Sequence, residues 1–173
     1  GTGKTTLAMV LANELQIPYR LFNAVTSNKK DLEKIFDEAK YYRGMIVIVD
    51  EVHRLNKDKQ DLLLPYIEDG TITLIGATTA NPYHSINPAI RSRCHLLEVK
   101  SLSEEEISKG IKRAIKAKEG LNNKINLTDD AIKQIAKTTG GDMRYALNFL
   151  DVVKISFNKK EINSDDIKSI LKV

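Results

Sequence analysis

The stretch Met45-Ile-Val-Ile-Val-Asp-Glu51 decides the fold of this chain. Its first five residues are apolar, and a strand that is apolar at every position is typically covered on both faces. Parallel strands flanked by helices meet this condition, whereas a half-exposed antiparallel strand alternates apolar and polar residues. We therefore predict an α/β domain with a parallel sheet, in which Asp50 and Glu51 follow the carboxyl end of one strand.

The rest of residues 1–100 alternates strand-like and helix-like segments. Further strands are predicted over Tyr19–Asn23, Thr71–Ile75 and His95–Val99. The helical segments between them are marked by apolar residues at helical spacing, by a helix-capping Asn56 and by Pro65, which we expect to kink or end its helix. The first helix carries the apolar run Leu7–Ala12, which we expect to be buried.

After residue 100 the strand signals stop. A capping box at Ser103 opens one helix, and Thr128, Asp142 and Ser164 are predicted to cap three more. One apolar face of the third helix is predicted to comprise Met143, Ala146, Leu147, Leu150, Val153 and Phe157. We therefore expect two domains, an α/β core over residues 1–100 and a small all-helical lid over 101–173.

Composition narrows the function classes. The 173 residues are 42% hydrophobic with a net charge of +4, which permits a nucleic-acid partner without requiring one. The single cysteine, Cys94, excludes an intramolecular disulfide and suits a reducing compartment, so we expect a cytoplasmic protein. No apolar run approaches the roughly 18 residues of a membrane span. Because the chain begins with Gly rather than Met, we expect it to be part of a longer protein.

The segment Gly1-Thr-Gly-Lys-Thr-Thr6 is a candidate phosphate-binding loop. Glycines let backbone N–H groups turn toward an anion, and a following helix adds a favourable dipole. Gly1, Thr2, Gly3, Lys4, Thr5 and Thr6 are therefore the predicted nucleotide-binding residues. Lys4 would reach the β- and γ-phosphates of ATP, and the Thr5 hydroxyl would bind Mg²⁺. The full motif is Gly-x-x-x-x-Gly-Lys-Ser/Thr, and its first three residues are absent from this sequence.

Asp50 and Glu51 strengthen this interpretation, because ligands of open α/β folds bind at the carboxyl edge of the sheet. Asp50 can hold hydrated Mg²⁺, and Glu51 can orient and deprotonate the attacking water. The alternative is an ordinary acidic turn after a strand. Together, the loop and the acidic pair predict a nucleoside triphosphatase.

Two further positions are candidates for this site. Thr78, with Thr79 as its rival, follows the predicted strand Thr71–Ile75 and could hydrogen-bond the γ-phosphate or the attacking water. Arg93, with Arg91 as its rival, could reach a neighbouring subunit's nucleotide as an arginine finger or pair with a carboxylate of its own chain.

Arg144, near the start of a lid helix, could return to the phosphates and report loss of the γ-phosphate. The alternative is a surface ion pair with Asp151. A lysine-rich helix over residues 109–118 could contact a phosphate backbone, but a solvated charged face is the favoured interpretation. The cysteine and the histidines lack zinc-ligand spacing, so no metal other than Mg²⁺ is expected.

The box Asp50-Glu-Val-His53 also matches the DEAH-type helicases. We reject this assignment because those helicases usually place the box much further from the phosphate loop and continue into a second α/β motor domain. His53 is then interpreted as a local turn or interface residue.

The order of these elements resembles AAA+ ATPases of the clamp-loader group, and more specifically the replication-associated recombination protein A family, relatives of the eukaryotic Werner-helicase-interacting protein. The residues that carry the resemblance are Asp50–Lys57, Gln60–Pro65 and Glu68–Pro82, of which Thr71–Pro82 is the most specific. The resemblance covers essentially the whole chain. Arg91 departs from the family, where an apolar residue is usual.

The resemblance implies a P-loop fold and a DNA-dependent ATPase that uses ATP and Mg²⁺ at stalled or damaged replication forks. It implies forked or single-stranded DNA and single-stranded-DNA-binding protein as partners. It also implies a homotetramer in which Arg93 completes the neighbour's site, with Thr78 as sensor 1 and Arg144 as sensor 2. Clamp-loader subunit, branch-migration motor, nucleotide-gated scaffold and non-enzymatic interaction fragment remain alternatives. Because the family's first strand and half of its phosphate loop are missing, we expect this piece alone to be inactive.

Overall fold

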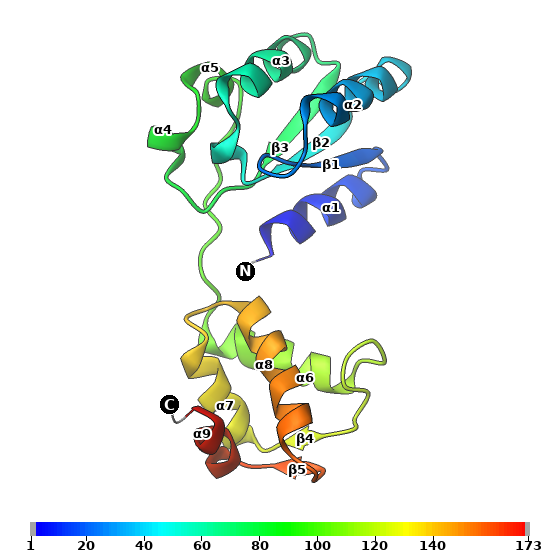
Figure 1. Cartoon of the computed structure of the whole chain (residues 1–173). Coiled ribbons are helices and arrows are strands. Elements are labelled where there is room, and N and C mark those ends of the chain that lie inside the picture. Colours follow the sequence, from blue (N-terminus) through cyan, green and yellow to red (C-terminus); the bar gives the residue numbers. More distant parts are fainter. Residues whose placement is uncertain (1–2, 172–173) are drawn as a thin grey trace. The chain divides into compact units, whose positions relative to one another are not determined.

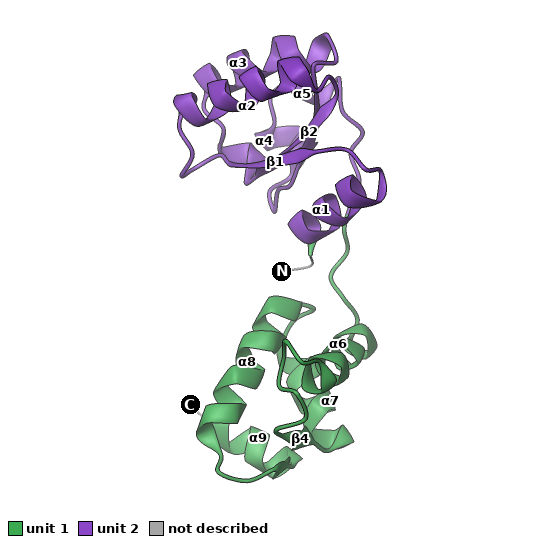
Figure 2. Ribbon diagram, turned by 90° about the vertical axis from the view of Figure 1, so that its right-hand side faces the viewer, with its two compact units in different colours: residues 1–3, 99–173 green, residues 4–98 purple. Residues whose placement is uncertain are grey.

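The computed structural model describes residues 3–171. The chain divides into two compact units, residues 4–98 and residues 99–173 together with the first three (Figure 2).

The first unit is built on a parallel sheet of three strands in the order β1-β2-β3. The strands are β1 (Tyr19–Asn23), β2 (Met45–Asp50) and β3 (Ile72–Gly76). All five residues Met45–Val49 of β2 are at most 2% exposed. The predicted α/β fold with a parallel sheet is confirmed, and β2 is its covered central strand.

Helices cover both faces of this sheet (Figure 1). On one face, α1 (Lys4–Glu14) packs Ala8 and Ala12 against Ile46 and Ile48 of β2. On the other face lie α2 (Lys29–Tyr41) and α3 (Lys57–Glu68), which form a second core with alternate β2 residues. Short helices η1 (Val52–Arg54), α4 (Pro82–Ser85) and α5 (Pro88–Arg91) follow the strands β2 and β3.

Three expectations for this unit need correction. Residues 95–99 form no strand, because β3 is an edge of the described sheet and no further strand lies on its outer side to pair with them. The run Leu7–Ala12 is not uniformly buried: Leu7 is 59% exposed, because α1 buries only the small face that carries Ala8 and Ala12. Of the kink or end expected at Pro65, the end is contradicted, because α3 continues to Glu68.

Among its described residues, the second unit has four helices and one short ladder. The helices are α6 (Glu104–Lys116), α7 (Asp129–Thr138), α8 (Met143–Ser156) and α9 (Ser164–Leu171). They share one core, to which Ile107, Ile135, Leu150 and Ile167 contribute fully buried side chains. The unit is not entirely helical, because β4 (Asn126–Leu127) pairs in parallel with β5 (Glu161–Ile162).

The helix starts of this unit follow the sequence closely. Ser103 forms the predicted capping box, and Thr128 and Asp142 accept hydrogen bonds from the backbone N–H groups of Ala131 and Tyr145. The prediction for α9 was wrong by one residue, because the capping oxygen comes from Asn163, which accepts from the N–H of Asp166.

The predicted apolar face of α8 is only partly buried. Ala146, Leu150 and Val153 lie in the core of the second unit, whereas Leu147 is 40% exposed. Leu147 follows Ala146 by one residue, so a helix turns it about 100° away from the face that carries Ala146.

Candidate functional site

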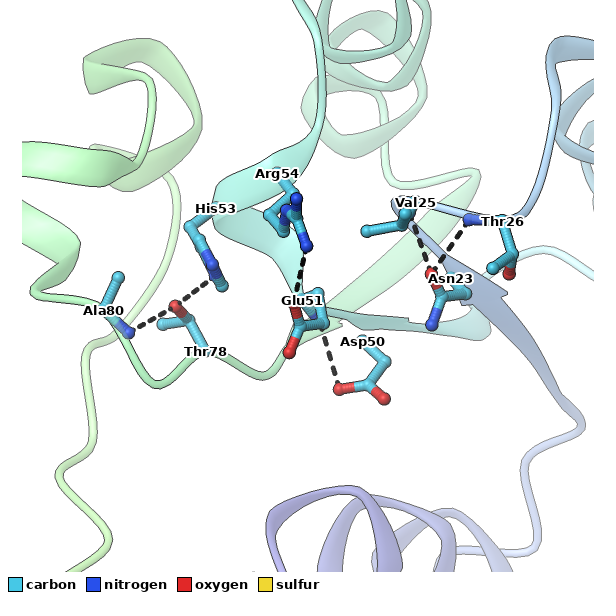
Figure 3. Close-up of polar contacts among 9 residues, drawn as sticks. All are labelled: Asn23, Val25, Thr26, Asp50, Glu51, His53, Arg54, Thr78 and Ala80. Atoms are coloured by element: carbon cyan, nitrogen blue, oxygen red, sulfur yellow. Dashed lines mark hydrogen bonds and ion pairs between the residues drawn. The ribbon is translucent and has the colours of Figure 1, made fainter.

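The candidate site lies at the carboxyl edge of the three-stranded sheet. Asp50 ends β2, Glu51 follows it, and Thr78 lies two residues beyond the end of the neighbouring β3. The parallel register pairs Val49 with Gly76, so both strands end at the same level. Figure 3 shows Asp50, Glu51 and Thr78 along this edge. Asp50 and Thr78, which are 28 positions apart in the sequence, therefore lie at the same edge of the sheet.

The two strand ends are tied together beyond the regular ladder. The backbone N–H of Ala77 donates to the carbonyl of Val49 at 2.9 Å, and the N–H of Val52 donates to the carbonyl of Ala77 at 3.1 Å. A Cβ atom on Gly76 would lie 3.0 Å from Cγ1 of Val52. The glycine therefore permits the close approach that sets the distance between the Glu51 turn and the Thr78 segment.

Glu51 adopts the left-handed backbone conformation, with φ 56° and ψ 41°. For a residue with a Cβ atom this costs roughly 1–2 kcal/mol, and such residues concentrate at functional sites. Its N–H donates to Oδ1 of Asp50 at 3.0 Å, and Nη1 of Arg54 lies 3.9 Å from its Oε2. The Glu51 side chain is 39% exposed, so its carboxylate can meet a water molecule.

The start of α1 lies toward the same edge. The backbone carbonyl of Pro18, just after α1, accepts from the N–H of Ile46 near the beginning of β2. The 11-residue helix is about 16 Å long, comparable with the roughly 17–20 Å of a strand it crosses. Lys4 at its other end is therefore carried toward Asp50, and it is partly buried, as is Thr5. Thr6 is exposed.

The phosphate loop is described from Gly3 onward. Gly3 has φ +84°, and nothing lies within 4 Å of a Cβ built there, so the glycine supplies a positive-φ turn beside open space. Gly1 and Thr2, also predicted to bind nucleotide, lie outside the described residues.

Oxygen donors at this edge fit Mg²⁺. The Asp50 carboxylate and the Thr5 hydroxyl are hard ligands, and Mg²⁺ in phosphate sites keeps several waters and uses few protein ligands. Within residues 3–171, no three His, Cys, Asp or Glu side chains gather where they could hold a metal by themselves.

Thr78 has a partner that the sequence did not indicate. Its hydroxyl oxygen lies 2.7 Å from Nδ1 of His53 and accepts from the N–H of Ala80 at 3.0 Å. Thr78 is partly buried and Thr79 is exposed. His53 is thus joined to the segment that follows β3 (Figure 3), a long-range contact for which the box Asp50–His53 gives no signal.

Asn23 is a second edge residue that the sequence analysis missed. It ends β1 and is the register partner of Asp50. Its side-chain oxygen accepts from the N–H groups of Val25 and Thr26 at 2.8 and 3.1 Å. The sequence did hold a signal for this residue, because Asn23 is a polar residue at the end of a β-rich run. Such a residue is typical of a turn that ends a strand, here β1 beside Asp50.

The rival arginines are both held by their own chain. Nη2 of Arg93 lies 2.8 Å from Oε1 of Glu68, and its Nη1 donates to the carbonyl of Ala89 at 2.8 Å. Arg91 donates to the carbonyl of Tyr83 at 2.7 Å and lies over the Tyr83 ring. Arg93 is exposed and Arg91 is partly buried, so Arg93 is the more accessible of the two.

Arg144 belongs to the second unit, at the first turn of α8, and is exposed. It makes no ion pair with Asp151 in the part of the chain that the structure describes. On the lysine-rich α6, Lys109 pairs with Glu105 at 3.4 Å and Lys112 with Asp129 at 3.7 Å. These pairs are consistent with a solvated charged face.

Comparison with known proteins agrees with this arrangement. The chain is 49% identical over 158 residues to replication-associated recombination protein A of Bacillus subtilis, covering 90% of this chain and 38% of that protein. It is 40% identical over 166 residues to the ATPase WRNIP1 of Dictyostelium discoideum, covering 93% of this chain and 19% of that protein. The chain thus spans well under half the length of these curated relatives.

Among solved structures, the RuvB Holliday junction branch migration motor of Thermotoga maritima is similar, with a TM-score of 0.83 and 31% identity. The alignment covers 98% of this chain and 57% of that one. Among residues 3–171 no helix is long and apolar enough to cross a bilayer. Residues 1–102 match the ATPase family associated with various cellular activities (AAA), and the chain belongs to this family.

Proposed function

We propose that the protein carrying this chain is an ATP-hydrolysing AAA+ protein that acts on DNA in replication-fork maintenance, recombination and repair. Family membership supports the ATPase activity. The DNA-related role is supported by similarity to replication-associated recombination protein A and to WRNIP1.

The observation that carries the ATPase proposal is the common edge of Asp50, Glu51 and Thr78, toward which α1 also carries Lys4. Lys4 would bind the β- and γ-phosphates, and Thr5 with Asp50 would hold Mg²⁺, which supplies charge neutralisation at the phosphates. Glu51 would orient the attacking water and accept its proton, while Thr78 would hydrogen-bond the γ-phosphate or that water.

Two arginines complete the proposal. Arg93 would act on the nucleotide of a neighbouring subunit in a homo-oligomer, a tetramer by the resemblance, and Arg144 would respond to the γ-phosphate and move the lid. Forked or single-stranded DNA and single-stranded-DNA-binding protein are the proposed partners, in the cytoplasm and, in a bacterium, at the nucleoid. The 173-residue piece alone is proposed to be inactive.

The test is ATP binding and hydrolysis by the intact protein, with and without forked DNA. Lys4→Ala should abolish binding. Glu51→Gln should leave binding intact and reduce kcat by roughly 10²–10⁴-fold, because it removes a general base. The control Glu33→Gln, on exposed α2 surface, should behave as wild type. Normal turnover by Glu51→Gln would contradict the assignment of the base.

A second candidate is a branch-migration motor, favoured by the similarity to RuvB. The same preparations would be given a four-way DNA junction. ATP-driven movement of the junction would favour the motor. A clamp-loader subunit would instead copurify with a sliding clamp, and a nucleotide-gated scaffold would bind ATP with little turnover on forked DNA.

A further inference from the structure

The hydroxyl group of Thr78 has two hydrogen-bond partners, and they limit what it can offer to a nucleotide. A threonine hydroxyl carries one hydrogen and accepts at most two hydrogen bonds. The N–H of Ala80 already occupies one acceptor position at 3.0 Å, and Nδ1 of His53 lies at 2.7 Å. What Thr78 can offer to a third group therefore depends on which partner supplies the hydrogen in the His53–Thr78 bond.

Two arrangements are available. If Nδ1 of His53 carries no hydrogen, Thr78 donates its single hydrogen to His53 and can only accept elsewhere. If Nδ1 carries the hydrogen, His53 donates to Thr78, both acceptor positions are filled, and the hydroxyl hydrogen is directed to another oxygen. Only the second arrangement lets Thr78 donate to a phosphate oxygen or to the oxygen of the attacking water.

We propose that His53 is a positioning residue that donates from Nδ1 to Thr78, so that the Thr78 hydroxyl is oriented as a donor toward the reacting γ-phosphate or water. The inference rests on the ATPase activity proposed above, and it gives His53 a role through Thr78 without contact to the nucleotide.

The backbone around the pair supports a fixed geometry. His53 lies in η1, immediately after the Glu51–Val52 turn, and the bonds Val52 N–H to Ala77 carbonyl and Ala77 N–H to Val49 carbonyl hold the two segments together. His53 and Thr78 are both partly buried. The side-chain bond continues this backbone connection, so a change at His53 is expected to reach Thr78 without displacing Asp50.

Substitutions at His53 can separate the two ring nitrogens. An Asn side chain places its amide near the position of Nδ1, whereas the longer Gln places its amide near Nε2. In the intact protein, His53→Ala and His53→Gln should lower kcat for ATP roughly two- to tenfold, the effect of one lost hydrogen bond, with KM little changed. His53→Asn should restore most of the loss. His53→Asp, which can only accept, should be at least as impaired as His53→Ala.

A double-mutant cycle tests whether His53 acts through Thr78. The combination of His53→Ala with Thr78→Val should have the kcat of Thr78→Val alone, because the positioned group is already gone. Additive losses, or a His53→Asn variant as slow as His53→Ala, would overturn the proposal. A direct readout is the side-chain ¹⁵N resonances of His53, which should show hydrogen on Nδ1 in wild type and change in Thr78→Val.

The outcomes separate this inference from the proposed function. If the intact wild-type protein does not hydrolyse ATP, with or without forked DNA, the ATPase proposal fails. If wild type hydrolyses ATP and Thr78→Val is impaired but His53→Ala is not, the ATPase proposal stands and the role of His53 is wrong.

Discussion

Arg93 is bound to Glu68 of its own chain, with 2.8 Å between Nη2 and Oε1. Both side chains remain about 40% exposed, at 39% and 43%. An exposed pair of this kind contributes about 0–1 kcal/mol to stability, so it can exchange partners at little cost. The Arg93 guanidinium is therefore held in a defined place on the surface, and leaving Glu68 for the proposed neighbouring subunit would cost little.

Arg93→Ala is expected to lower kcat of the intact oligomer by roughly 10³-fold or more, with ATP affinity nearly unchanged, if the side chain acts as a finger. Mixing Arg93→Ala subunits with Lys4→Ala subunits should restore part of the ATP turnover, because some interfaces then combine an intact Lys4 with an intact Arg93. The absence of recovery after confirmed subunit exchange would contradict action in trans. Arg91→Ala, which loses only a contact to Tyr83, is the matched control.

Gly76→Ala is expected to destabilise the first unit by about 1–3 kcal/mol, because the new methyl group presses on Val52. Urea unfolding followed by circular dichroism measures the change. The double variant Gly76→Ala with Val52→Ala should regain part of the loss, since the smaller side chain makes room. If the second substitution only adds to the damage, the close approach is not the cause.

Asn163→Ala should destabilise α9 by about 1 kcal/mol, because the N–H of Asp166 loses its capping oxygen. Ser164→Ala should have little effect, since the cap lies at the preceding residue. Thermal unfolding of the two variants compares them directly. If Ser164→Ala were less stable than Asn163→Ala, Ser164 rather than Asn163 would be the capping residue.

Asp166 predicts a pH dependence for the second unit. The backbone N–H of Asn163, and then Lys159 at 2.7 Å, stabilise the carboxylate and lower its pKa from 3.8. A lowered folded-state pKa stabilises the fold above the unfolded-state pKa, and this contribution is lost as pH falls below about 4 and through the folded-state pKa.

Wild type and Asp166→Asn should therefore differ in thermal stability at pH 6, with wild type the more stable, and converge toward pH 2. Lys168→Gln, a charge change on the same helix, is the control and should not reproduce this convergence. A difference between wild type and Asp166→Asn that stays constant from pH 6 to pH 2 would contradict the role of the carboxylate.

The features that sequence predicted well are local. The strand β2 and the caps at Ser103, Thr128 and Asp142 depend on residues within one turn or one strand, and the acidic pair follows directly from the end of β2. Exposure of Leu7 and the absence of a strand at residues 95–99 depend on what lies beside these segments in space. The partners His53–Thr78 and Glu68–Arg93 are 25 residues apart in each case, and no periodicity indicates them.

At Glu51, the residue that would best stabilise the fold differs from the residue that the proposed ATP hydrolysis requires. Glycine adopts φ near +56° without a steric penalty. Glu51→Gly is therefore expected to raise the free energy of unfolding of the first unit by about 1 kcal/mol, while it removes the proposed base. A laboratory selection for thermal tolerance alone would favour the change, and a selection for ATP turnover would reject it. A glutamate in this conformation is what selection for chemistry, rather than for folding, would retain.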